Sequence, residues 1–477
     1  MGAIRTIAVF GVVSTTACAG APGTGGTGIL APRLSEAQEI RAGQRAAREV
    51  TRTLGLVADQ ALQDYVQQVG ARLAAASERS QLPWTFRVVD DPMPNAFALP
   101  GGYVFVTRGM LGVINSEAEL AGVIAHEIAH VNAKHGIQAL TRQAGAQLGV
   151  WAVPVAELRS LGGGAAAGAG LLFVEHGPDA ERQADDMSFR NMLAAGYDVR
   201  EMGGVFSALG RLETIGGRSA LPSWLVTHPD PGDRVETATR RAGAVLDPPD
   251  SLSLNRSEYL EQIEDLVYGH DPRQGFFRGP TFVHPDLRFR LELPAGWSYR
   301  SLAQAVVATS PDREAAMQLA VVEQAGPDEA AERFLGQPGV RATGNTATDS
   351  VSGNAFVVVP FRATTNASAG TGVAAWIGYG GRTYQIVGVA TSQAGNGHTE
   401  AFRQAVGSFA PVADSRLLEV RPNRINIVRL GRATTFAEFN RRYPSAVDAE
   451  EVALLNRIAG ANSTLRAGRR MKRVVRG

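Results

Sequence analysis

Two histidines and a glutamate stand in an order and spacing that suit metal-assisted hydrolysis. Residues 116–136 read Ser-Glu-Ala-Glu-Leu-Ala-Gly-Val-Ile-Ala-His-Glu-Ile-Ala-His-Val-Asn-Ala-Lys-His-Gly. In a helix His126 and His130 leave the same face because they are four residues apart, so both imidazoles can bind one ion. Glu127, beside the first histidine, is placed to hold a water against that ion. The pattern H-E-x-x-H therefore predicts a zinc site, and a catalytic zinc site usually needs a third protein ligand.

A candidate for the third ligand lies 51 residues beyond His130, in the segment Glu181-Arg-Gln-Ala-Asp185. The two acids are four residues apart, so in a helix they share one face. A ligating Glu181 would bring Asp185 close enough to accept the outer N–H of a histidine ligand, a contact that such ligands usually make. Two acids at this spacing can also form a solvated helix face, but beside the histidine motif we interpret Glu181 as the ligand.

The elements that must position these residues can also be predicted. Ser116, with Glu119 three residues later, is a capping box, and Gly136 stands where a helix can stop, so a helix is expected between them. Apolar residues at helical spacing also cover residues 35–80. Two strands are expected, at 84–89 and 103–107. We therefore expect a mainly helical domain with a small β-sheet.

Four segments of the chain together resemble one family. They are Asn95–Gly109, His126–His130, Glu181–Asp185 and Thr227–Arg234, in the order in which that family has them. The chain is similar in these segments to the gluzincin zinc metallopeptidases, the family of HtpX, BepA and the CAAX prenyl endopeptidases. Because an export signal is predicted and no apolar stretch reaches the length of a membrane helix, the chain is most similar to the periplasmic BepA-like branch.

This resemblance implies a role for each matching residue. One Zn2+ per chain would be bound by His126, His130 and Glu181, with Glu127 as the general base. Asp185 would orient a ligand, and Arg234 would support the loop that contains His228 or the acidic surroundings of the metal. Asn95 and Tyr103 would line the substrate groove. The substrate is expected to lie extended and to add a strand to the sheet edge near residues 103–107.

His228 has three interpretations at this point. By the resemblance it can occupy the open position of the zinc and hold the enzyme latent, because a fourth imidazole completes a closed tetrahedral site. It can instead donate to the oxyanion once its loop swings away. The third interpretation is a histidine that fixes a Thr-His-Pro turn. The other histidines have no partner spacing and are expected at the surface or as caps: His135, His176, His270, His284 and His398.

The N-terminal residues predict export. Residues 1–18 have the charged, apolar, small-residue order of a secretory signal. The small residues before Cys18, the only cysteine of the chain, resemble a bacterial lipobox, in which the cysteine is acylated and becomes the mature N-terminus. Ala17-Cys18-Ala19 also fits an ordinary cleavage site, which would give a soluble exported protein. We expect a lipoprotein on the periplasmic side of the cell envelope, with residues 19–34 as a flexible tether.

Length and composition set the domain count. A chain of 477 residues with 44% hydrophobic and 19% charged residues is large and apolar enough for two to four folded domains. Its net charge of +1 gives no global attraction to nucleic acid. We expect an α+β protein with a zinc metallopeptidase domain at 35–250, an α+β accessory domain that resembles PsbP at 281–412, and a small βααβ domain that resembles LysM at 423–477.

The C-terminal residues concentrate positive charge. Residues 421–477 hold 13 Arg or Lys against 4 Asp or Glu. This surface can contact peptidoglycan or an anionic lipid, or it can be a solvated basic face. The sequence as a whole predicts an exported zinc-dependent endopeptidase that cleaves misfolded or misassembled envelope proteins. The alternatives are a zinc-containing assembly chaperone with little proteolysis and a cell-wall-binding adaptor that acts through the tail.

Overall fold

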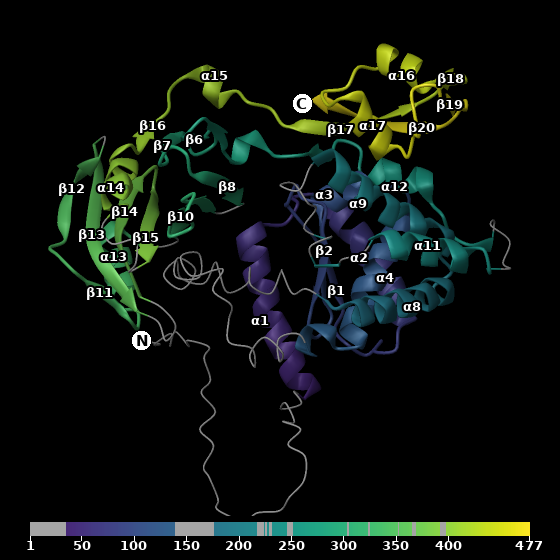
Figure 1. The fold of residues 1–477 in the computed structure, drawn as a ribbon, viewed down its shortest axis with the longest axis horizontal. Coiled ribbons are helices and arrows are strands. Elements are labelled where there is room, and N and C mark those ends of the chain that lie inside the picture. The colour runs from purple at the N-terminus through teal and green to yellow at the C-terminus, as the bar shows by residue number, and fades with distance from the viewer. Residues whose placement is uncertain are drawn as a thin grey trace, which may run out of the picture. The chain divides into compact units, whose positions relative to one another are not determined.

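Helices and β-sheets both occur along the chain in the structure, a computed structural model, so the predicted α+β class is confirmed (Figure 1). The structure describes residues 35–138, 176–216, 224, 227–228, 231–245, 251–302, 305–322, 325–351, 353–364, 369–391 and 397–477. Cys18, the predicted signal peptide and the predicted tether lie outside these residues. Within the described ranges, no helix combines the length and the apolar character that crossing a membrane requires.

Residues 35–262 form helices around a small sheet. The helices are α1 (Glu36–Leu54), α2 (Gln60–Ala75), α3 (Arg108–Val113), α4 (Glu117–Asn132), α8 (Pro178–Ala194), the short η2 (Val199–Glu201), α9 (Met202–Gly216), α11 (Pro231–Ala242) and α12 (Arg256–Gln262). The strands are β1 (Thr85–Val89), β2 (Ala96–Leu99) and β3 (Tyr103–Thr107). The helical stretch predicted at 35–80 is thus two helices, and Gly55, with a φ of 70°, ends the first of them.

The strand order of this sheet is β1-β3-β2. β1 runs parallel to β3, and β2 runs antiparallel to it, so β3 is the central strand and β2 lies at an edge. The strands predicted at 84–89 and 103–107 are confirmed, whereas β2 was not predicted as a strand. α4 packs against β2, α2 and α8, and buried apolar residues of the sheet, α2 and α4 share one core.

α4 begins at a cap, and a residue in the left-handed conformation follows its C-terminal end. Ser116 Oγ accepts a hydrogen bond from Glu119 N at 3.1 Å. The Glu119 carboxylate accepts from Asn115 N at 2.7 Å instead of returning to Ser116 N, so only half of the predicted capping box forms. Lys134, with a φ of 58°, turns the chain away from the helix axis. The prediction that Gly136 ends the helix is wrong, because Gly136 lies in the helical turn that follows.

Residues 272–418 form two further sheets with flanking helices. The smaller sheet has the order β16-β7-β6-β5, from β5 (Phe276–Arg278), β6 (Thr281–His284), β7 (Phe289–Glu292) and β16 (Ala410–Pro411). The larger sheet has the order β11-β13-β14-β15-β10-β9-β8, from β8 (Ser298–Leu302), β9 (Ala305–Thr309), β10 (Ala315–Val322), β11 (Val340–Ala342), β13 (Asn354–Thr364), β14 (Ala369–Tyr379) and β15 (Arg382–Thr391), and β12 (Ala347–Val351) also pairs with β13. The helical elements are η5 (Pro272–Gln274), α13 (Pro327–Leu335), α14 (Thr399–Gly407) and α15 (Ser415–Leu418).

The two longer helices of this region cover opposite faces of the larger sheet. Phe334 of α13 packs in one apolar cluster with Trp376 of β14. Phe402 of α14 belongs to a second cluster with Ile377, the next residue of the same strand. Because successive side chains of a strand point to opposite faces, the two helices lie on either side of β14.

The C-terminal residues follow the predicted order of strand, helix, helix and strand. The elements are β17 (Asn423–Arg429), β18 (Thr434–Thr435), α16 (Phe436–Arg442), α17 (Ala449–Leu455), β19 (Thr464–Leu465) and β20 (Arg470–Arg476). β17 pairs with β20 and also with β4 (Val267–Tyr268), which gives a sheet of order β20-β17-β4. Ile425 of β17 is buried in the same core as α2 and α4. The C-terminal segment therefore shares its core and one sheet with residues before 270.

Two of its basic residues are turned inward. The Lys472 side chain is 0% exposed, and its Nζ donates to the carbonyl oxygens of Gly112 at 2.8 Å and Ile114 at 2.9 Å. These carbonyls belong to the end of α3, where helical carbonyls lack partners within the helix. Arg457 donates to Val113 O at 3.2 Å and pairs with Glu119 at 3.0 Å. Part of the basic charge that the sequence assigned to an outer surface thus stabilises the turn between α3 and α4.

Replacing Lys472 should therefore destabilise the protein. Burial and the charge of Arg457 lower the pKa of Lys472, so its carbonyl partners must offset an unfavourable burial. In Lys472→Met those carbonyls lose their donor, and we expect the free energy of unfolding to fall by about 1–3 kcal/mol. Urea unfolding measures this value. The matched control is Lys134→Met, the only other lysine, whose side chain is 44% exposed and should cost less than about 1 kcal/mol. Equal stability of the two variants would contradict the proposed cap.

Candidate metal centre

α4 places His126 and His130 on one buried face. The helix is buried along nearly its whole length, and the two histidines are 1% and 3% exposed. Their Nε2 atoms lie 3.0 Å apart. The spacing of four residues therefore brings both imidazoles to one point, as expected for a shared ion.

α8 brings Glu181 to the same point. The helix begins at Pro178, whose fixed φ suits a first turn and whose missing N–H would have no partner there. One turn later, Glu181 Oε2 lies 3.3 Å from His126 Nε2, and Glu181 Oε1 lies 3.4 Å from His130 Nε2. The structure thus brings together the three residues that the sequence singled out as ligands.

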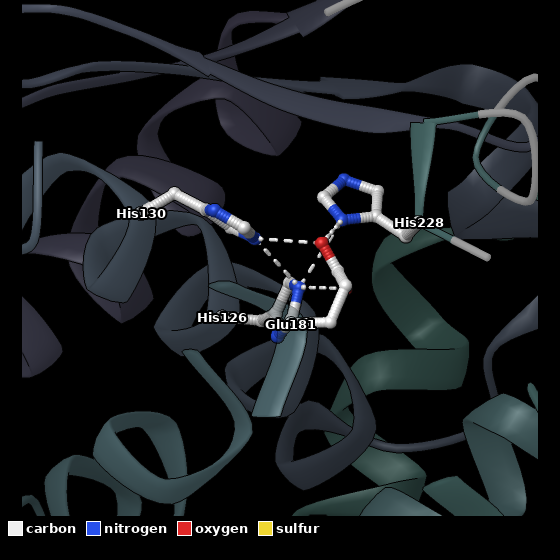
Figure 2. Close-up of side chains that lie close together, drawn as sticks. All are labelled: His126, His130, Glu181 and His228. Atoms are coloured by element: carbon white, nitrogen blue, oxygen red, sulfur yellow. Dashed lines mark hydrogen bonds and ion pairs between the residues drawn. The ribbon is translucent and has the colours of Figure 1, made fainter. Parts of the chain in front are cut away.

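His228 approaches from the segment before α11. Its backbone N donates to Trp224 O at 2.8 Å, and its ring stacks on the Trp224 ring with centroids 4.7 Å apart. His228 Nδ1 is 3.2 Å from His126 Nε2 and 3.0 Å from Glu181 Oε1. The side chains of the four residues point toward one another (Figure 2).

The spacing of these donors fits a zinc ion. One atom of each residue lies within 4.8 Å of the corresponding atoms of the others, and all four residues are buried. His126 Nε2 lies 3.0 Å from His130 Nε2 and 3.2 Å from His228 Nδ1. Because His126 Nε2 can share only one proton, it cannot form a hydrogen bond with both nitrogens through a proton of its own. In tetrahedral zinc sites the metal–ligand distances place neighbouring ligand atoms about 3.3 Å apart. Imidazole nitrogen and carboxylate oxygen are also ligands that zinc accepts.

Asp185 and Arg234 balance the charge behind these donors. Asp185 Oδ1 lies 3.1 Å from His126 Nδ1. Arg234 donates to both Asp185 oxygens, at 2.9 and 2.7 Å, and its Nη1 lies 3.1 Å from Glu181 Oε2. Its guanidinium also lies over two aromatic rings, 4.2 and 4.7 Å from their centroids. Arg234 therefore supplies positive charge to two buried carboxylates and is itself fixed by packing.

The surroundings shift the pKa values of these groups. Burial raises the pKa of Glu181, but the neighbouring imidazoles of His228, His126 and His130 outweigh it, so the net shift is downward. Burial likewise raises the pKa of Asp185, but Arg234 and His126 lower it to about 2. Burial lowers the pKa of His130 well below its ordinary value. Both carboxylates are therefore anionic and His130 is neutral at pH 7, which is the form in which these groups bind metal.

Glu127 follows the first histidine and faces the centre. It is 1% exposed, and its Oε1 lies 3.4 Å from His228 Nε2. This oxygen accepts no hydrogen bond within the part of the chain that the structure describes. Burial raises the pKa of Glu127. A buried carboxylate with an unused acceptor and a raised pKa is suited to take up and release a proton.

Two more histidines lie at this site, contrary to prediction. His135 and His176, expected at the surface or as caps, are 3% and 9% exposed. The ring of His176 stacks on that of His130 at 4.0 Å, and His135 Nδ1 lies 3.0 Å from His130 Nδ1. The expectation of surface positions is wrong, because residues on both sides of the centre fold back over His130. The only sequence signal was the short distance of five residues between His130 and His135.

A pocket opens beside the centre, between the C-terminal end of α4 and β2. Its wall includes Phe97, Leu99, Val131 and Ile137, with Glu127 and His228 at the metal side. Neither Asn95 nor Tyr103, the predicted groove residues, lines it. Asn95 is buried before β2, and Tyr103 packs in the apolar cluster of α1.

The predicted substrate edge must also be corrected. Residues 103–107 form β3, which has β1 on one side and β2 on the other, so this strand has no open edge. β2 is the edge strand beside the pocket. The prediction failed because β2 is only four residues long and its register depends on pairing with β3.

A histidine pair on one helix, with a glutamate from a second helix, defines the gluzincin class of zinc metallopeptidases. The comparison with known families agrees: residues 60–242 match Peptidase family M48. This part of the chain is similar to family M48, whose members are zinc-dependent metallopeptidases. The match contains all four donors together with Asp185 and Arg234.

Individual relatives support this assignment. A Vibrio cholerae protein named as a beta-barrel assembly-enhancing protease is 31% identical over 225 residues, which cover 45% of this chain and 46% of that protein. The mitochondrial metalloendopeptidase OMA1 of Arabidopsis thaliana is 33% identical over 159 residues, 33% of this chain and 31% of that protein. The chain thus spans less than half the length of these relatives. The solution structure of a cyanobacterial PsbP from Synechocystis aligns with 28% of this chain over 91% of its own length. The sequence identity is 12% and the TM-score is 0.24, so the PsbP resemblance stays a prediction.

Removing the charge of Arg234 should destabilise the centre. Arg234→Met keeps the length of the side chain but leaves Asp185 and Glu181 without their shared cation. We expect the free energy of unfolding of the metal-free protein to fall by about 3–5 kcal/mol, as measured in urea. The control is Arg240→Met on the same helix, whose side chain is 67% exposed and whose loss should change stability by about 0.5 kcal/mol or less. Similar stabilities of the two variants would show that Arg234 does not balance these acids.

Proposed function

We propose that the chain is an exported zinc-dependent endopeptidase that cleaves misfolded or misassembled envelope proteins. The observation that carries this proposal is the convergence of His126, His130 and Glu181 at the pocket, with Glu127 directly beside them. The choice of envelope substrates is supported by relatives whose name is beta-barrel assembly-enhancing protease. In this proposal His126, His130 and Glu181 are the ligands of one Zn2+.

The chemistry divides between the metal and the protein. Zinc, when bound, supplies Lewis-acid chemistry that acidifies water and polarises the scissile carbonyl. Glu127 takes the proton of the attacking water and later gives it to the leaving amine, which its raised pKa favours. Asp185 holds the outer N–H of His126, so that Nε2 keeps its lone pair toward the centre. Arg234 keeps Asp185 anionic and in place.

The substrate backbone is proposed to pair with β2. Asn95 O accepts a hydrogen bond from Thr107 N at 2.9 Å, so this pair faces β3. Along an antiparallel strand alternate residues point their N–H and C=O groups to opposite sides, so Ala98, which lines the pocket, presents its groups to the open edge. An extended peptide can add a strand there and place its carbonyl at the metal side of the pocket. Recognition through main-chain groups suits substrates that have lost their fold but differ in sequence.

His228 is proposed to act as a latch. Its Nδ1 takes the place among the donors that a catalytic site keeps open for water. Because the residue lies between Thr227 and α11 and not in α4 or α8, its side chain can leave while the other three donors stay. The oxyanion role remains an alternative for the state in which the latch is open.

Localisation and accessory contacts complete the proposal. Acylation at Cys18 would anchor the chain on the periplasmic side of the envelope, with residues 19–34 as tether. Residues 281–412 would serve as a PsbP-like accessory domain. Residues 423–477 would be a LysM-like domain that meets peptidoglycan or anionic lipid with the basic residues not used against α3. The competing proposals are a zinc-containing chaperone that rarely cleaves and a cell-wall adaptor.

The glutamate next to the first histidine provides the direct test. Glu127→Gln should keep one zinc per chain but lower the rate of cleavage of an unfolded protein such as casein by at least about 100-fold, because the general base is gone. Zinc is measured by elemental analysis and cleavage by release of peptides. Glu236→Gln, at a side chain that is 78% exposed, is the control and should cleave normally. A wild-type protein that binds zinc but does not cleave would favour the chaperone, and cleavage by Glu127→Gln at the wild-type rate would exclude this mechanism.

Whereas the loss of Glu127 should lower the cleavage rate, the latch proposal predicts that the loss of His228 raises it. His228→Ala should raise the basal cleavage rate by about threefold or more, because the open form no longer competes with a closed one. His270→Ala, an exposed histidine outside the centre, should leave the rate unchanged. A lower turnover number in His228→Ala with an unchanged KM would instead assign His228 to the oxyanion.

A further inference from the structure

A series of hydrogen-bond contacts runs from the surface of α8 to the outer nitrogen of His130. His130 Nδ1 lies 3.0 Å from His135 Nδ1. The other nitrogen of that ring, His135 Nε2, lies 3.2 Å from Gln183 Oε1. His135 is 3% exposed, whereas Gln183 is an exposed residue of α8. His135 and Gln183 therefore connect the proposed zinc ligand His130 to the surface of α8.

The chemistry of the last member determines the position of each hydrogen. An amide oxygen only accepts, so the nitrogen that faces it, His135 Nε2, must carry its hydrogen. A neutral imidazole has one N–H, so His135 Nδ1 is then an acceptor. The hydrogen between the two rings therefore belongs to His130 Nδ1. His130 Nε2 is left with its lone pair directed toward His126 and Glu181.

We infer that His135 and Gln183 are positioning residues that fix His130 in the tautomer able to bind zinc. The inference rests on the proposed role of His130 as a ligand. It gives α8 three separate functions toward one centre. Glu181 supplies a donor atom, Asp185 holds His126, and Gln183 holds His130 through His135.

The two histidines are held by different kinds of group. The outer nitrogen of His126 faces a carboxylate that Arg234 balances, whereas the outer nitrogen of His130 faces an imidazole whose other nitrogen meets an amide. A second acid beside His130 would add another buried negative charge, and Arg234 is the one arginine or lysine among the described residues that contacts Asp185 and Glu181. The neutral series orients His130 without that electrostatic cost.

Zinc affinity tests this inference, and the variants are chosen by their hydrogen-bonding ability. His135→Phe keeps an aromatic ring but accepts nothing, so the zinc dissociation constant should rise by about 10- to 100-fold, the usual effect of losing such a partner. His135→Gln offers an amide oxygen to His130 and should recover most of the affinity. Gln183→Glu keeps an acceptor and should bind like wild type, whereas Gln183→Met should bind more weakly. His270→Phe is the control outside the centre and should equal wild type.

The affinities are measured by competition with a chromogenic chelator in the Glu127→Gln background, so that cleavage plays no part. A second readout is the nitrogen chemical shift of the His130 ring in metal-free protein, which should report hydrogen on Nδ1 in wild type and a mixture in His135→Phe. Wild-type affinity and an unchanged tautomer in His135→Phe would overturn the inference. A protein that binds no zinc at all would instead overturn the proposed function.

Discussion

Two carboxylates, Glu181 and Asp185, are buried beside imidazoles, and the whole centre depends on how their charge is compensated. An isolated buried carboxylate would be protonated and could not bind a cation. Here Arg234 contacts both acids, and the neighbouring rings of Phe206 and Trp224 pack against the guanidinium and keep it in place. The segment that supplies Arg234 also contains His228. The residue proposed to close the centre and the residue that neutralises its acids are therefore only six positions apart in the sequence. The charge balance of the centre and its fourth donor therefore come from one short stretch, whereas the other three donors come from α4 and α8.

The position of the edge strand links this centre to a substrate. β2 lies between the central strand and the pocket, and its main-chain groups at Ala98 face away from the sheet. The walls of the pocket are mostly apolar, whereas Glu127 and His228 stand at one side. In the proposed function such an arrangement would bind the backbone of a peptide and make few contacts with its side chains.

Local patterns were sufficient to predict the donors, but not their neighbours. The spacing of His126 and His130 and the proline at the start of α8 depend on one helix each, so the sequence carries that information. The burial of His135 and His176 depends on how distant segments fold over His130, and no periodicity records it. The edge strand was missed for a similar reason, since four residues contain too little alternation to indicate a strand. Lys472 was counted as part of a basic surface, because only tertiary packing shows that its partners are carbonyls of α3.

The contact between Lys472 and the end of α3 also has a consequence in time. The lysine and Gly112 are 360 residues apart in the sequence. At ordinary rates of synthesis, ribosomes need about 20–70 s to cover that length. During that interval the turn before α4 has no lysine to satisfy its carbonyls, and β4 has no β17 to pair with. α4 therefore reaches its final surroundings only when β20 has been made, so the packing around this helix is completed at the end of synthesis.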